Sequence, residues 1–129
     1  MSGAVKRRAI LLAAIASGPV AACARRAPVY TASAVSFAGD APASVRSEQI
    51  RRAGVGLGWA MEDAGPGLIR GTLNLRTHQA VVDIPYDRQR FSIRYAGSTD
   101  LNYDGTSIHS NYNGWVQRLE QTIVAQSSV

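Results

Sequence analysis

The chain has 129 residues and a formal net charge of +5 at pH 7, from 14 lysines and arginines against nine acidic residues. This length suits one domain with a small core and modest stability. The single cysteine, Cys23, excludes an intramolecular disulfide.

Residues 1–22 have the three parts of an export signal. Cationic residues at 6–8 precede a short apolar run at 9–16, and small residues follow that run. The apolar run is about half of the roughly 20 residues that a membrane-spanning helix needs. We therefore predict a cleaved signal peptide over residues 1–22 and no spanning anchor.

Val20-Ala21-Ala22-Cys23 resembles a bacterial lipobox. The resemblance implies that Cys23 becomes the first residue of the mature protein and carries a lipid, which would be its link to the membrane. Two or more acyl chains hold a protein stably in a bilayer. Ala24 follows the cysteine, instead of the aspartate that retains enteric lipoproteins in the inner membrane, so the resemblance implies an outer-membrane lipoprotein facing the periplasm. An ordinary leader with a cysteine near its cut is the alternative.

Removal of the leader changes the charge of the protein. Lys6, Arg7 and Arg8 leave with it, so eleven arginines remain against nine acidic residues and the net charge falls to +2. Nucleic-acid binding is therefore not expected.

The mature chain divides into a tether over residues 23–42 and one domain over residues 43–129. The tether is rich in Ala, Ser, Pro and Thr. Weak alternation over residues 29–37 leaves open whether part of it joins the sheet as an edge strand.

The first helix is expected to begin at Ser44, which would cap it. Glycines at positions 54, 56 and 58 should end it, and they do not fit a dinucleotide-binding fingerprint. The predicted inward face consists of Val45, Ile50, Ala53 and Leu57, and the predicted outward face of Arg46, Glu48, Arg51 and Arg52.

Two alternating runs, residues 69–76 and 78–86, predict an antiparallel hairpin that turns at Thr77-His78. This turn places Leu75 opposite Ala80. A second turn over residues 87–90 adds a third strand.

The third strand would place Val82 opposite Tyr95 and Asp83 beside Arg94 as a cross-strand ion pair. Pro85 cannot donate to the ladder, so the central strand must bulge or end there.

The last helix is predicted from a stripe at intervals of three and four, with Ser110 as its cap. The stripe and the first helix would cover one face of the sheet. The predicted class is α+β: a three-stranded antiparallel meander, with a fourth N-terminal strand left open, and two helices packed on one face. The stripe consists of Ile108, Tyr112, Trp115, Leu119 and Ile123.

Residues 50–123 contain a longer pattern. It comprises His78-x-Ala80-x-Val82-x-Ile84-x-Tyr86, then Ser92-Ile93-x-Tyr95 with Ser98, Leu101 and Tyr103, and finally Ile108-His109-x-x-Tyr112-Asn113-x-Trp115-Val116-x-x-Leu119. This pattern resembles a family of small lipoproteins from Gram-negative bacteria that has no established activity. The resemblance implies a location and an architecture, and it supplies no catalytic residues.

The run of residues 100–105 matches the first six positions of a calcium loop, in which Asp100, Asn102 and Asp104 would be the ligands. Against this, the twelfth position is Asn111 instead of glutamate, and a strand precedes the loop. A turn that uses Asp, Asn and Gly for their backbone tolerance is the favoured interpretation.

His78 and His109 are too few for a structural zinc site, and no serine lies in a G-x-S-x-G elbow. We therefore predict no enzyme, no cofactor and no metal. His109 is instead expected to fix the entry to the last helix by hydrogen bonding.

Arg70, Arg76 and Arg94 are candidates for contact with anionic headgroups or an acidic partner, with a solvated polar face as the alternative. The predicted function is an interaction module that binds an envelope protein or an envelope polymer. A small-ligand or calcium-binding domain is the alternative, with a seam beside Tyr86, Tyr95 and Trp115 as a second binding place.

Overall fold

The computed structural model of the chain describes residues 25–129. The predicted signal peptide and Cys23 lie outside the described residues. The elements follow in the order β1 (Arg26–Pro28), β2 (Ala32–Ser36), α2 (Ala43–Gly56), β3 (Ala60–Gly65), β4 (Leu68–Leu75), β5 (His78–Pro85), β6 (Arg90–Thr99), β7 (Ser107–His109) and α3 (Ser110–Ser127).

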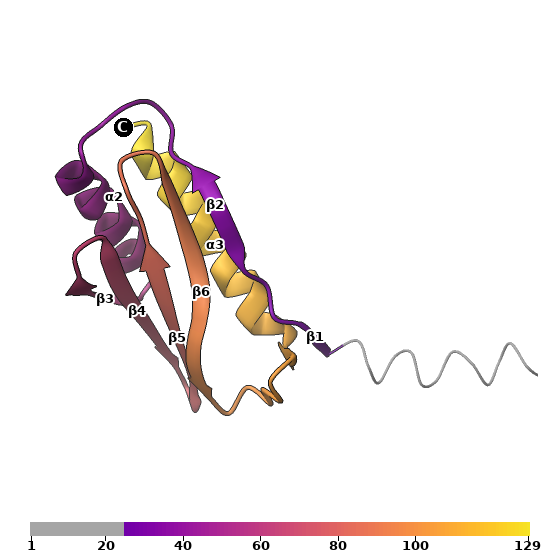
Figure 1. Cartoon of the computed structure of the whole chain (residues 1–129). Coiled ribbons are helices and arrows are strands. Elements are labelled where there is room, and N and C mark those ends of the chain that lie inside the picture. Colours follow the sequence, from indigo (N-terminus) through magenta and orange to yellow (C-terminus); the bar gives the residue numbers. More distant parts are fainter. Residues whose placement is uncertain (1–24) are drawn as a thin grey trace, which may run out of the picture.

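The main sheet has five antiparallel strands in the order β2-β6-β5-β4-β3, and β1 and β7 form a separate two-stranded sheet. Both helices lie on the same side of the main sheet (Figure 1). The class is α+β, but the predicted three-stranded meander is wrong. The sequence left undecided whether the N-terminal segment forms a strand, and this strand is present as β2. Strand β3 and the two-stranded sheet were not predicted.

The missed strand β3 and the undecided strand β2 lack the pattern that identifies a strand from sequence. In β3 only Met61 is half-buried, because β3 is an exposed edge strand. In β2 only Ala32 is buried, and a bulge interrupts its pairing with β6. Alternation reports burial of one face, so strands with little burial give no such signal.

The register of the β4–β5 hairpin differs from the prediction by two residues. Leu73 pairs with Ala80 and Leu75 with His78, because the turn uses Arg76 and Thr77, with Arg76 in the left-handed region at φ 58°. A shift of two residues keeps every side chain on its face. The apolar face was therefore predicted correctly although the partners were not.

The pairing of β5 with β6 agrees with the prediction. Val82 pairs with Tyr95 and Asp83 with Arg94, and β5 ends at Pro85. A bulge lies between Val81 and Val82, where the register shifts by one residue.

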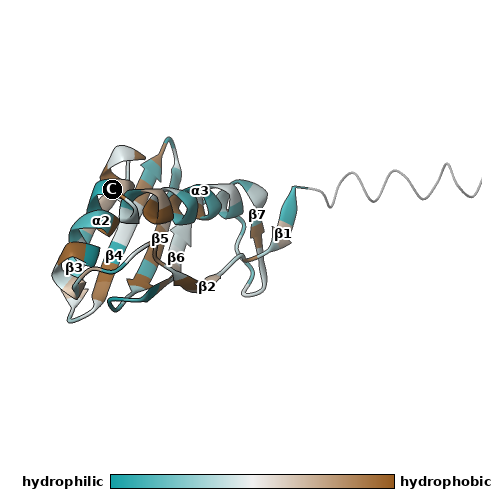
Figure 2. Cartoon of the chain, turned by 90° about the horizontal axis from the view of Figure 1, so that it is seen from above, coloured by the Kyte–Doolittle hydropathy of each residue, from teal (hydrophilic) through white to brown (hydrophobic). Residues whose placement is uncertain are grey.

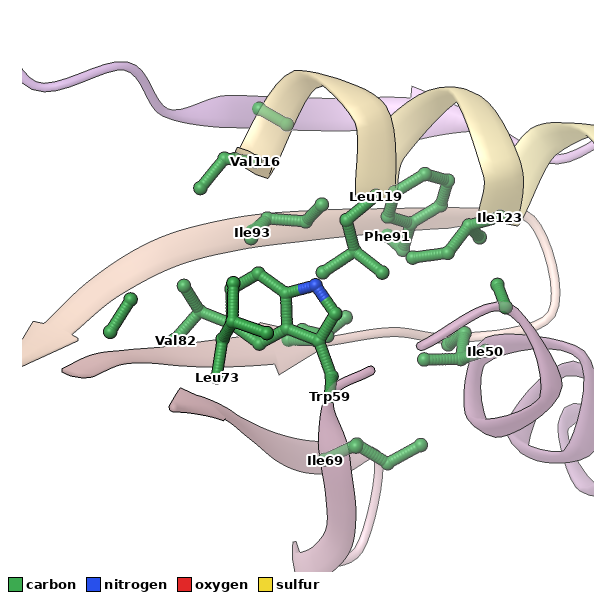
Figure 3. Close-up of a cluster of buried hydrophobic side chains, with 14 of the residues drawn as sticks. Ile50, Trp59, Ile69, Leu73, Val82, Phe91, Ile93, Val116, Leu119 and Ile123 are labelled. Atoms are coloured by element: carbon green, nitrogen blue, oxygen red, sulfur yellow. The ribbon is translucent and has the colours of Figure 1, made fainter. Parts of the chain in front are cut away.

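The core lies between the sheet and the two helices. Hydrophobic and hydrophilic residues alternate along the strands (Figure 2), and the apolar face meets α2 and α3. Trp59, from the turn between α2 and β3, inserts between the strand residues Leu73 and Val82 and the helix residue Leu119 (Figure 3). The other labelled members of this cluster are Ile50, Ile69, Phe91, Ile93, Val116 and Ile123.

Helix α2 begins after Pro42 with no side-chain cap, so Ser44 is not its N-cap. The helix ends at Gly56, within the glycine string, as expected. Gly54 faces β3 at close range, where any side chain would collide with Met61. The glycine string therefore ends the helix and also lets β3 approach it.

Arg46 was predicted to face water, and this is wrong, because its side chain is fully buried. Its Nε donates to the carbonyl of Arg88 at 3.0 Å, Nη2 to Gly39 at 2.9 Å, and Nη1 to Ala38 at 3.2 Å. Nη1 also donates to Oε1 of Gln49 at 3.0 Å. The guanidinium carbon lies 4.4 Å from the ring centroid of Phe37, within cation–π range.

Helix α3 is capped by His109, whose Nδ1 accepts from the backbone N–H of Asn111 at 3.2 Å. The expectation that His109 fixes the entry to this helix is confirmed, and the expectation that Ser110 caps it is wrong. Ile108 belongs to β7, so the helical part of the stripe starts at Tyr112.

Replacing Arg46 with Met should destabilise the full chain by about 3 kcal/mol or more, because the buried guanidinium is the charged donor to three carbonyls in two loops. The control is Arg52→Met on the same helix, where the exposed arginine makes one bond to Gln126. That variant should lose about 1 kcal/mol or less. Urea unfolding followed by circular dichroism gives both values, and equal losses would show that burial of Arg46 is not decisive.

Candidate functional site

The loop at residues 100–105 is organised by its own carboxylates. Oδ1 of Asp104 accepts from the N–H groups of Ser107 at 2.8 Å and Thr106 at 3.0 Å, and Oδ2 accepts from Nη2 of Arg26 at 2.6 Å. The two backbone bonds and then Arg26 hold the pKa of Asp104 at about 2, below its usual 3.8. Asp104 therefore already has protein donors on both oxygens.

The other two calcium candidates have left-handed backbones, with φ of 59° at Asp100 and 54° at Asn102. Oδ2 of Asp100 accepts from the hydroxyl of Thr77 at 2.5 Å. Within residues 25–129, no group of three or more His, Cys, Asp or Glu side chains could hold a metal ion. The geometry is that of a tight turn closed by hydrogen bonds.

The three candidate arginines are not brought together. Arg70 forms the ion pair with Asp83, at 2.9 Å between Nε and Oδ1, and the predicted pair of Asp83 with Arg94 is replaced by it. Arg94 lies across from Asp83 on the next strand, so both arginines flank one carboxylate. Arg76 sits in the β4–β5 turn, six residues from Arg70 and about 20 Å farther along the strand direction.

His78 is the first residue of β5 and lies beside β7. Its Nδ1 is 2.7 Å from the carbonyl oxygen of Asp100, and its ring centroid is 6.5 Å from His109 and 6.3 Å from Trp115. In the described part of the chain, neither histidine is hydrogen-bonded to a hydroxyl group.

The three aromatic residues of the predicted seam lie in different places. Tyr95 stacks on Tyr103, with ring centroids 4.1 Å apart. Tyr86 is bridged to Phe91 beyond the opposite end of β5. Trp115 borders one cleft and Tyr86 borders another, separate hollow, so the seam is not one site.

This cleft, which we call the tryptophan cleft, has a volume of about 470 Å³ and was not predicted. Its walls come from the turn after α2, the end of β4 and the first two turns of α3. They consist of Leu57, Trp59, Leu73, Leu75, Ser110, Asn111, Gly114, Trp115 and Arg118.

Local structure explains how these walls form. Gly58 has a φ of 95° and turns the chain so that Trp59, only 4% exposed, enters the core with part of its ring bordering the cleft. Leu75 is 46% exposed and forms part of the rim. Gly114 lies in the second turn of α3, and no group outside the adjacent helix backbone stands within 4 Å of where a Cβ would be, so this position leaves the wall hollow.

The charges around the tryptophan cleft have one sign. No acidic residue lines it, and Arg118 is the single charged residue in its lining. Among residues 25–129, the ion pairs involve other arginines and His78, and none involves Arg118. The cleft thus combines apolar side chains with the polar groups of Ser110 and Asn111 and with an available cation, Arg118.

One feature of the sequence points to this cleft. Glycine costs up to about 1 kcal/mol relative to alanine within a helix, so Gly114 inside the predicted last helix calls for a packing or functional reason. The wall residues come from three separate segments, 57–59, 73–75 and 110–118, and no local pattern links them.

Comparisons of the chain with protein-family models, curated proteins and solved structures found no match. Neither described helix is both long and apolar enough to cross a membrane. The function is therefore inferred from the geometry of the molecule.

The low pKa of Asp104 predicts a specific acid response. A carboxyl with a folded pKa near 2 stabilises the fold above its unfolded pKa of about 3.8, and that contribution disappears as the pH falls through 2. Asp104→Asn should therefore show a shallower loss of thermal midpoint between pH 4 and pH 2 than the wild type. Parallel curves for the two proteins would contradict the assigned hydrogen bonds.

Proposed function

We propose that this protein is a lipid-anchored lipoprotein of the outer membrane that faces the periplasm and acts as an interaction module. It binds an envelope protein or an envelope polymer, and it does not transform its partner. The observation that carries this proposal is the tryptophan cleft, which combines exposed apolar surface with a free cation.

The cleft has the features of binding sites in general. Ligand clefts measure roughly 300–1,000 Å³ and are mostly apolar with a few polar groups. Tryptophan and arginine are also the residues most enriched among those that dominate binding energy. The tryptophan cleft has two tryptophans, three leucines and one arginine.

The position of the anchor supports the same proposal. The carbonyl of Arg25, two residues after Cys23, accepts from the N–H of Ser110 at 2.9 Å, and Ser110 lines the cleft. The described chain enters the domain at β1, beside the start of α3 (Figure 1). A lipid on Cys23 would hold this end of the cleft close to the membrane surface.

A small-ligand binding function is the second candidate, because the same cleft could hold one compact molecule. A calcium site is less favoured, since both oxygens of Asp104 already accept hydrogen bonds.

Lipidation can be tested on the protein isolated from membranes. Mass spectrometry of its amino terminus should find Cys23 as the first residue with acyl chains attached, and Cys23→Ser should release the protein from the membrane fraction. An unmodified cysteine, or a cut elsewhere, would overturn the anchor and the localisation with it.

Partner binding can be tested by photo-crosslinking in intact cells. A benzoylphenylalanine at Leu75, on the rim of the cleft, should give a discrete adduct. The same group at Asn74, also exposed but on the opposite face of β4, is the matched control and should give none. Equal labelling from both positions would refute the cleft as the contact site.

A further inference from the structure

We propose that the tryptophan cleft binds a single-chain amphiphile, with the apolar chain inside the cleft and an anionic head at Arg118. This inference rests on the second candidate function, small-ligand binding, since it names the ligand class that the same cleft would take.

The shape of the cleft favours an elongated apolar body. Its wall on α3 is a stripe at positions 111, 114, 115 and 118, which spans about two helical turns, or roughly 10 Å. Gly114 lies in the middle of this stripe and leaves a hollow where other residues would place a side chain. The facing wall is apolar, with Leu57, Leu73 and Leu75. A narrow chain can lie along such a wall and contact both indole rings.

The charge of the cleft selects the head group. A cationic head would meet Arg118 with no carboxylate to offset it, because no acidic residue lines the cleft. An anionic head would form a charge-assisted bond with a guanidinium that has no ion-pair partner among the described residues. A carboxylate can accept two parallel bonds from one arginine.

The fluorescence of the two tryptophans provides a direct measurement of ligand binding in the cleft. The chain contains two tryptophans, and both Trp59 and Trp115 line the cleft. Intrinsic fluorescence of the full chain carrying Cys23→Ser should therefore change saturably when laurate is added below the concentration at which it forms micelles. The substitution removes the protein's own lipid, so added laurate is the ligand that is measured.

Substitutions at Gly114 test where the apolar chain of the ligand binds, and a substitution at Arg118 tests where its head group binds. Gly114→Leu fills the hollow and should abolish the laurate response, whereas Gly114→Ala should keep most of it. Neither should unfold the protein, because space is open at this position and both residues favour helix over glycine. Arg118→Gln should weaken laurate binding about fivefold and leave binding of dodecanol unchanged. Arg94→Gln, an exposed arginine on the other face of the sheet, is the control.

The outcomes separate this inference from the proposed function. Absence of a saturable response, or Gly114→Leu binding laurate like the wild type, would overturn the amphiphile site. Equal laurate affinity in Arg118→Gln and the wild type would overturn the anionic head. A crosslinked adduct at Leu75 without any laurate response would retain the interaction module and reject only this ligand class.

Discussion

The guanidinium of Arg46 is the contact that connects the separate parts of this small fold. It projects from α2 and donates to carbonyls in two loops, residues 37–40 after β2 and the turn between β5 and β6. A buried charge is costly unless its donors are satisfied. Here the guanidinium donates to carbonyl oxygens and to the side chain of Gln49, and it lies against the ring of Phe37. Outside, the ion pair of Arg88 with Asp40 joins the same two loops and lowers the pKa of Asp40.

The tryptophan cleft depends on this arrangement. Because α2 is held against the end of the sheet, its glycine-rich C-terminus delivers Trp59 into the core next to Leu119 of α3 (Figure 3). The cleft lies where this turn, the end of β4 and the start of α3 approach one another without closing the gap. It is therefore a consequence of how the helices are placed.

The two faces of the sheet offer different surfaces to a partner. On the open face, Glu62, Arg70, Asp83 and Arg94 lie opposite one another across four strands. The charges in this row alternate and sum to zero, and exposed pairs of this kind contribute little energy. The helix-covered side carries the apolar cleft with the single cation of Arg118. Specific recognition is better served by the cleft, since its apolar surface can be desolvated on binding.

The sequence by itself determined the elements whose periodicity reports burial: strands β4 to β6 with their apolar face, the buried positions Tyr112, Leu119 and Ile123 of α3, and the end of α2 at its glycines. It could not distinguish registers that differ by two residues, since both keep the same face inward. Only the tertiary structure decided that Arg46 is buried, because its acceptors Ala38, Gly39 and Arg88 come from loops that no local pattern connects to it. The same holds for the cleft, whose walls meet only when α2, β4 and α3 pack together.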